Sequence, residues 1–163
     1  MAQLSRQHVL EVESEIKCPA DAFYDLLKNK IIDTPILFPE IYKSSKVLQG
    51  DGKSLGSVMH WVYVIDAKSD QYLEVKGKLT EADDEKRSLT YTAVGGDLLK
   101  THKSFAARVS VTPKSKESSI VKWSIIYEKL NEDDPNPLPY CDIFAGITSK
   151  YDAHFHNNHQ VIN

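Results

Sequence analysis

Four side chains in the sequence combine a reactive group with a position that we expect to face the protein interior. His154 carries an imidazole, which works as a base or a hydrogen-bond donor near neutral pH. Tyr63 and Tyr151 carry phenol hydroxyls that can orient a carbonyl or hydroxyl group of a bound molecule. Lys103 carries an ammonium group that can anchor an acidic ligand or donate a proton. We therefore take His154, Tyr151, Tyr63 and Lys103 as the candidate catalytic residues.

Each of these candidates also has a purely structural explanation. A hydrogen-bonded core imidazole accounts for His154, and rings that fill a core account for the tyrosines, without any chemistry. Lys103 lies two residues from Phe105, so an unbroken strand points both side chains the same way, whereas a β-bulge would turn the lysine outward. The sequence leaves these alternatives open.

Three histidines near the C-terminus raise the question of a metal site, because neighbouring imidazoles can share one ion. His154, His156 and His159 have no cysteine or carboxylate partner in the pattern, and cationic histidines suit the C-terminal end of a helix. Cys18 and Cys141 form no C-x-x-C pair and have no neighbouring histidine that would activate a thiol. We therefore predict no functional metal, no cofactor and no disulfide framework.

A glycine-rich stretch, GDGKSLG at residues 50–56, looks at first like a nucleotide phosphate loop. The motif G-x-x-x-x-G-K-[ST] requires a glycine where this sequence has Val47, and it must lead into a helix. The residues that follow, SVMHWVYVI at 57–65, are rich in β-branched and aromatic types, which favour a strand. The stretch is therefore predicted to be a turn between two strands, in which the glycines adopt conformations that side chains oppose.

The composition limits the classes of function. The chain has 163 residues, 41% of them hydrophobic and 26% charged, with a formal net charge of −3. These values predict one globular domain, residues 1–163, without the basic surface that a nucleic-acid partner requires. No apolar run has the length of a signal peptide core or of a membrane span. We expect a cytoplasmic protein with no nucleic-acid and no membrane partner, either a monomer or a weak dimer.

The first 40 residues predict one strand and two short helices. HVLEVESEIK at 8–17 alternates polar and apolar residues, with Leu10, Val12 and Ile16 inward. In CPADAFYDLLK at 18–28, apolar residues recur at helical spacing behind a proline that suits a first turn. A second short helix is broken by two prolines, and its apolar residues are expected to cover the core: Ile31, Ile32, Ile36, Leu37 and Phe38.

Residues 41–129 predict six strands joined by short polar turns, which is an antiparallel meander. Alternation places large side chains on its inward face: Met59, Trp61, Tyr63, Leu73, Val75, Leu79, Leu89, Tyr91, Phe105, Ala107, Val109, Val121, Trp123, Ile125 and Tyr127. A proline-spaced segment then precedes an amphipathic helix over residues 138–157, with an apolar stripe of Tyr140, Ile143, Phe144, Ile147, Tyr151, His154 and Phe155. These elements predict an α+β fold in which a strongly curved sheet grips the final helix.

Six local strings resemble the plant major latex proteins, a branch of the birch-pollen-allergen-like, pathogenesis-related ten superfamily. They are ADAFYDLL at 20–27, YKSSKVLQGDGKSLGSV at 42–58, GDLLK at 96–100, SFAARVSVTPK at 104–114, VKWSIIYEKLNEDDPNP at 121–137 and DAHF at 152–155. Each string alone is unspecific, but the set spans most of the chain in the family's order. The resemblance implies a helix-grip (START-like) fold: a seven-stranded curved antiparallel sheet around a long C-terminal helix, two short helices and an internal hydrophobic cavity.

The resemblance also implies an intracellular binder or carrier of small hydrophobic plant metabolites, of the terpenoid, steroid, alkaloid or hormone class. The residues that we expect to bind such a ligand are Leu27, Leu37, Met59, Trp61, Tyr63, Leu89, Tyr91, Phe105, Ala107, Trp123, Ile125, Phe144, Ile147, Tyr151 and His154.

An alternative is a cofactor-free cyclase or isomerase that acts on a reactive terpenoid or alkaloid intermediate, as some relatives do. In that case the cavity would fold the substrate and exclude water. The sequence carries no dedicated catalytic signature of those relatives. It also lacks the S-G-L-P-A gate and H-R-L latch of the fold's hormone receptors, with VGGDLL and THKSF nearby instead. This difference argues against an abscisic acid receptor.

Overall fold

The computed structural model describes the backbone of residues 6–159 and the side chains of residues 6–157. Within that range the elements follow the order β1 (His8–Ile16), α1 (Ala20–Lys30), η1 (Ile31–Asp33), α2 (Thr34–Leu37), β2 (Tyr42–Gln49), β3 (Val58–Tyr63), β4 (Leu73–Asp83), β5 (Ser88–Gly96), η2 (Asp97–Lys100), β6 (His102–Pro113), β7 (Ser119–Lys129) and α3 (Leu138–His159).

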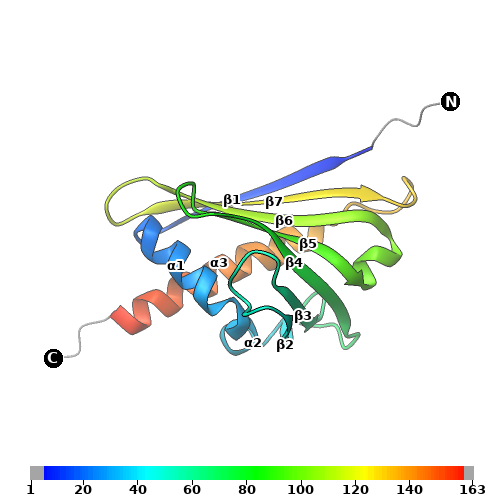
Figure 1. Cartoon of the computed structure of the whole chain (residues 1–163), viewed down its shortest axis with the longest axis horizontal. Helices are drawn as coiled ribbons and strands as arrows, with labels where there is room; N and C mark the ends of the chain where they lie inside the picture. The colour runs from blue at the N-terminus through cyan, green and yellow to red at the C-terminus, as the bar shows by residue number, and fades with distance from the viewer. Residues whose placement is uncertain (1–5, 160–163) are drawn as a thin grey trace.

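All seven described strands belong to one antiparallel sheet, in the spatial order β1-β7-β6-β5-β4-β3-β2. The sheet curves over α3, and α1 and α2 lie on the same side of it (Figure 1). The predicted helix-grip arrangement of a seven-stranded sheet around a long C-terminal helix is confirmed.

Alternation of side chains explains how each strand buries one face. In β1, Leu10, Val12 and Ile16 turn towards the core, while Glu11, Glu13 and Glu15 on the other face are exposed. All the residues that we predicted on the inward face of the meander are buried or half-buried. The period-2 pattern therefore identified the inner face of the sheet correctly.

The predicted helix at 18–28 corresponds to α1. Pro19 precedes its first residue and accepts a hydrogen bond from the N–H of Phe23 at 3.0 Å. Asp21 lies in the first turn and Lys28 in the last, where both charges interact favourably with the helix dipole. The helix buries the four side chains that its period predicts: Ala20, Phe23, Tyr24 and Leu27.

The segment after α1 differs from the prediction at two isoleucines. Ile32 and Ile36 were expected to cover the core, but they are 36% and 76% exposed. In the four-residue helix α2 it is Thr34 that faces inward, with only 1% of its surface exposed. A helix of one turn has room for few inward positions, so the isoleucine two residues after Thr34 turns towards solvent.

Tyr151 of α3 joins the helix to the segment that follows α1. Its hydroxyl donates to the carbonyl of Lys30 at 2.8 Å and lies 2.7 Å from the hydroxyl of Thr34. The Thr34 hydroxyl in turn donates to the carbonyl of Ile31 at 2.7 Å. Because Tyr151 is fully buried, these bonds satisfy polar groups that have no access to water. Tyr151 therefore holds α3 against the chain between α1 and α2.

The glycine-rich stretch at 50–56 is a turn between β2 and β3, as predicted. The Asp51 carboxylate accepts hydrogen bonds from the N–H groups of Lys53 at 2.8 Å and Ser54 at 2.7 Å. These bonds hold the pKa of Asp51 well below its usual range. Gly50, Gly52 and Gly56 all have positive φ. The loop binds its own carboxylate, so two of the N–H groups that a phosphate would need are already occupied.

We predict that Tyr151→Phe lowers the free energy of unfolding by about 1–3 kcal/mol, because it leaves buried polar groups of Lys30 and Thr34 short of a partner. Urea unfolding followed by circular dichroism measures the change. Tyr72→Phe removes the hydroxyl of a side chain that is 63% exposed, so it should change the unfolding free energy by less than about 0.5 kcal/mol. Equal stabilities for the two variants would contradict the structural role of Tyr151.

Candidate ligand-binding site

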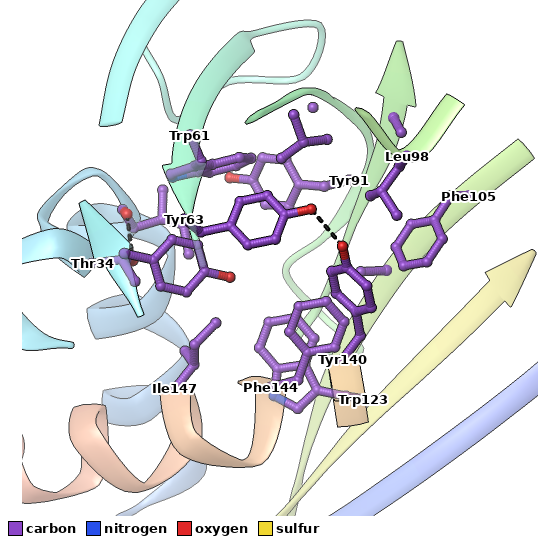
Figure 2. A pocket seen from close by; sticks show the side chains of 16 residues that line it. Thr34, Trp61, Tyr63, Tyr91, Leu98, Phe105, Trp123, Tyr140, Phe144 and Ile147 are labelled. Atoms are coloured by element: carbon purple, nitrogen blue, oxygen red, sulfur yellow. Dashed lines mark hydrogen bonds between the residues drawn. The ribbon is translucent and has the colours of Figure 1, made fainter. Parts of the chain in front are cut away.

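A cavity of about 90 Å³ lies between the inward face of the sheet and α3 (Figure 2). Side chains from α3, η1, α2 and the strands β2 to β7 form its wall, together with Leu98 of η2. The lining residues are Ile31, Thr34, Tyr42, Trp61, Tyr63, Val75, Gly77, Tyr91, Ala93, Leu98, Phe105, Ala107, Trp123, Tyr140, Phe144 and Ile147.

Two aromatic pairs make up much of this wall. The rings of Trp123 and Phe144 are stacked, with centroids 4.6 Å apart, and Trp61 meets Tyr91 edge-on at 5.5 Å. The indole N–H of Trp123 donates to the Thr148 hydroxyl at 2.9 Å. The polar atom of this tryptophan is thus satisfied within the protein, and its ring supplies apolar surface.

Gly77 of β4 makes room for one of these rings. A β-carbon at this position would lie 2.8 Å from Cζ3 of Trp61, closer than carbon atoms can approach. The missing side chain therefore leaves the space beside β4 that the indole of Trp61 occupies. No signal in the sequence marked this glycine as part of the wall.

Tyrosine hydroxyls are the main polar groups of the cavity. Tyr63 of β3 and Tyr140 of α3 bring their hydroxyl oxygens within 2.5 Å of each other, as Figure 2 shows. One of the two donates to the other, which leaves one O–H of the pair unused. The hydroxyls of Tyr42 and Tyr91 have no hydrogen-bond partner within residues 6–157. The wall therefore presents O–H donors that a bound molecule can use.

These hydroxyls stay protonated at neutral pH. Burial raises the pKa of Tyr91 to about 12, and burial is also the largest cause that raises the pKa values of Tyr42, Tyr63 and Tyr140. None of the lining residues given above is acidic, basic or histidine. The cavity can therefore bind apolar surface and donate hydrogen bonds, but its own wall offers no base that works near pH 7.

Eight of the fifteen predicted ligand-binding residues line the cavity. They come from β3, β5, β6, β7 and α3: Trp61, Tyr63, Tyr91, Phe105, Ala107, Trp123, Phe144 and Ile147. Sequence reasoning assigned no binding role to Thr34 and Tyr42, the first residues of α2 and β2, or to Leu98 of η2. It also missed Ala93, although this residue has the same inward parity in β5 as Leu89 and Tyr91. Tyr140 was predicted to lie on the apolar stripe of α3, and this stripe was the signal that could have identified it as a lining residue.

The other seven predicted residues lie outside the cavity wall. Leu89 and Ile125 point inward but are packed in the core, and Leu27 lies there from α1. Met59 of β3 is fully buried, while Leu37 is half-buried in α2. Tyr151 and His154 belong to later turns of α3, and neither lines the cavity. The inward face of the sheet is longer than the cavity, so inward direction alone does not identify a lining residue.

A β-bulge decides the position of Lys103. The pairing of β6 with β7 shifts between His102 and Ser104, so Lys103 occupies the extra position and is exposed. His102 turns inward instead and is only 8% exposed. Its Nδ1 lies 3.1 Å from the carbonyl of Leu98, while its Nε2 has no partner within the described residues. The candidate role of Lys103 inside the cavity is therefore wrong.

The histidines near the C-terminus form no recognisable metal centre in the described part of the chain. No group of three metal-binding side chains gathers there, and the side chain of His159 lies outside the described residues. His156 has a carboxylate neighbour after all, because its Nε2 lies 3.3 Å from Asp152. His154 is half-buried on α3. Among the described helices, none is both long and apolar enough to cross a membrane.

We predict that the buried tyrosines make the protein sensitive to alkali. A tyrosine whose folded pKa exceeds the ordinary value of about 10 contributes stability that is complete below about pH 10 and is lost as the pH rises through the folded pKa. Phenolate absorbance should therefore appear together with unfolding for Tyr91, whose folded pKa is about 12.

Ultraviolet absorbance and near-ultraviolet circular dichroism, recorded on the same samples, test this expectation. Tyr91→Phe should make the alkaline loss of stability less steep than in the unmodified protein. Complete ionisation of every tyrosine near pH 10, with the tertiary signal intact, would contradict the burial of the tyrosines that line the cavity.

Comparison with known proteins agrees with this geometry. Residues 5–158 match the model of the pathogenesis-related protein Bet v 1 family. The chain is 40% identical over 146 residues to major latex protein 146 of Papaver somniferum, which covers 89% of each protein. It is 31% identical to the crystal structure of ginseng major latex-like protein 151 from Panax ginseng, with a TM-score of 0.83, covering 91% of this chain and 97% of that one.

A third similarity concerns the fold alone. Norcoclaurine synthase from Thalictrum flavum superimposes with a TM-score of 0.73 at 20% identity, covering 93% of this chain and 87% of that one. The match of the family model and the identity to the poppy protein both extend over most of the sequence. By both measures, this chain is a member of the pathogenesis-related protein Bet v 1 family.

Proposed function

We propose that this protein binds a small, mainly apolar molecule whose buried part, between the sheet and α3, is uncharged. The observation that supports the proposal is an apolar, aromatic cavity whose tyrosine hydroxyls are not all satisfied by the protein. The fold of the Bet v 1 family is one that binds small hydrophobic ligands. Plant terpenoids and steroids fit this description best, because they are apolar and carry few oxygen atoms.

The energetics favour a neutral group inside the cavity. Burial of an aromatic or aliphatic ring that covers about 150 Å² contributes roughly 4 kcal/mol at 25 cal/mol per Å². A charged group in the same place would lose its hydration without meeting an opposite charge. Hydroxyl donors from tyrosine would orient a carbonyl or ether oxygen of the ligand at little cost, because the protein does not use all of them for its own hydrogen bonds.

We propose that the protein acts as a carrier in the cytoplasm. Cys18 and Cys141 are both free thiols, and burial raises the pKa of Cys18 to about 12. Unpaired thiols suit a reducing compartment, and a high pKa keeps this thiol unreactive.

We place the cyclase or isomerase alternative second. Its cavity would fold a reactive substrate and exclude water, and the wall adds tyrosine donors but no base that accepts a proton near pH 7. Similarity to norcoclaurine synthase at 20% identity concerns only the fold. A rate or product ratio for a reactive terpenoid intermediate that changes when the protein is added would reverse this order.

A cavity-filling substitution tests the binding proposal. Ala107→Leu adds three carbon atoms to a lining position of β6, so it should weaken binding of the neutral fluorophore N-phenyl-1-naphthylamine by at least about tenfold. Ala153→Leu makes the same change at an exposed position of α3 and should leave binding unaltered.

Fluorescence titration measures both variants, and urea unfolding checks that Ala107→Leu remains folded, because overpacking costs about 1–3 kcal/mol. If the unmodified protein does not bind the fluorophore, or if Ala107→Leu binds it equally well, this cavity is not the ligand site.

A further inference from the structure

The internal cavity has a second pocket next to it. An outer pocket of about 330 Å³ lies at the N-terminal end of α3, between η2, the first residue of β6 and the segment 134–137. Leu98 and Tyr140 line both the outer pocket and the inner cavity. His102, which lines the outer pocket, packs edge-on against Phe105 of the inner cavity at 5.5 Å. Only side chains therefore separate the two spaces.

Tyr140 is the central part of this separation. It lies in the first turn of α3 and is half-buried, with its ring 5.3 Å from Phe105 and 6.3 Å from Phe144. Its hydroxyl bonds to Tyr63, a residue of β3 that is 2% exposed (Figure 2). The bond joins the start of the helix to the sheet on the far side of the cavity.

The volumes show why this separation matters. An apolar cavity of about 150 Å³ accommodates one benzene ring, whereas the inner cavity measures about 90 Å³. Ligand pockets of ordinary proteins measure roughly 300–1,000 Å³. The inner cavity and the outer pocket together exceed 400 Å³ and fall within that range.

We propose that the two spaces form one bipartite ligand site and that Tyr140 is a movable partition within it. This inference rests on the proposed binding function and specifies which part of the chain limits it. When the Tyr140 side chain turns out of its place, its bond to Tyr63 breaks, and the Tyr63 hydroxyl becomes available to the ligand. The Tyr63–Tyr140 bond thus contributes to the cost of opening the site.

The chemistry of the two spaces differs and indicates the kind of ligand. The inner cavity has no charged side chain, whereas Asp97 and Asp134 line the outer pocket. Asp97 is held by Lys100 at 2.9 Å, and the Asp134 carboxylate has no ion pair in the described part of the chain. Lys129 donates to the carbonyl oxygens of Glu132 and Asp134 and to the side chain of Asn136, so its charge is already engaged.

The ligand of such a site is an elongated molecule with an apolar end inside and a hydrogen-bond-donating end outside. A hydroxyl or an amine matches the carboxylates of the outer pocket, whereas a carboxylate would be repelled by them. The bulge that turns Lys103 outward removes the ammonium group that an acidic ligand would have required.

Three variants test the partition with N-phenyl-1-naphthylamine as the probe. Tyr140→Ala joins the two spaces permanently and should bind the probe at least tenfold more tightly than the unmodified protein. Tyr140→Phe and Tyr63→Phe keep both rings but lose the same bond, so each should accelerate association several-fold. The double variant should be no faster than either single variant, because both substitutions remove one shared interaction.

Tyr24→Phe is the matched control, since it removes a tyrosine hydrogen bond, to Asp84 at 2.6 Å, that lies away from the cavity. It should not change the association rate. The partition would be overturned if Tyr140→Ala bound the probe no more tightly than the unmodified protein. It would also be overturned if the two phenylalanine variants associated with the probe at the rate of the control. In either case the proposed binding function still stands, provided that the unmodified protein binds the probe and Ala107→Leu does not. If neither the unmodified protein nor Tyr140→Ala binds, both proposals fail.

A series of naphthalene probes with the same ring tests the outer end. 2-Naphthylmethanol and 2-naphthylmethylamine should bind to Tyr140→Phe at least tenfold more tightly than 2-naphthoate in isothermal titration calorimetry. Asp134→Asn should reduce the preference for the amine over the alcohol several-fold. If 2-naphthoate bound as tightly as the alcohol and the amine, the outer pocket would not hold the polar end of the ligand. The same would follow if Asp134→Asn left the preference for the amine unchanged.

Discussion

The structure depends on how the concave face of one sheet is covered by a single long helix. Seven strands present a continuous apolar surface, and α3 has one stripe with which to bury it. Tyr151 holds the middle of the helix through Lys30 and Thr34, and the Tyr63–Tyr140 bond holds its beginning. Between these two attachments the helix and the sheet are separated by large rings instead of continuous small side chains. The cavity is the space that these rings do not fill.

The two attachments differ in their surroundings, and this difference separates structure from function. Tyr151 is fully buried, and its hydroxyl bonds to the Lys30 carbonyl and to the Thr34 hydroxyl, both in the chain between α1 and α2. Tyr140 is half-buried and bonds to another hydroxyl, which keeps a hydrogen in reserve. A residue of the first kind is costly to move, whereas one of the second kind can exchange its partner for a ligand. Tyrosine therefore serves as a fixed attachment in the middle of the helix and as an exchangeable contact at its beginning.

The fold could be predicted largely from the sequence, because alternation and helical spacing are local properties that burial enforces along the whole chain. Trp61, Tyr63, Phe105 and Trp123 were placed correctly for that reason. The bulge before Ser104 could not be predicted, because it depends on how β6 pairs with β7 and not on the residues of β6 alone. The extent of the cavity could not be predicted from the sequence either. Leu89 and Ile125 have the same inward parity as its lining residues, but tertiary packing places them in the solid core.

The aromatic pairs of the wall have a spectroscopic consequence. The chain contains two tryptophans, Trp61 and Trp123, and both line the cavity. All indole emission of this protein therefore originates at the candidate site, from one ring that lies edge-on to a tyrosine and another stacked on a phenylalanine. Any guest that displaces water or a neighbouring ring there changes the surroundings of the only indole fluorophores present. The protein thus carries an intrinsic optical reporter of occupancy, which allows candidate metabolites to be screened without a label.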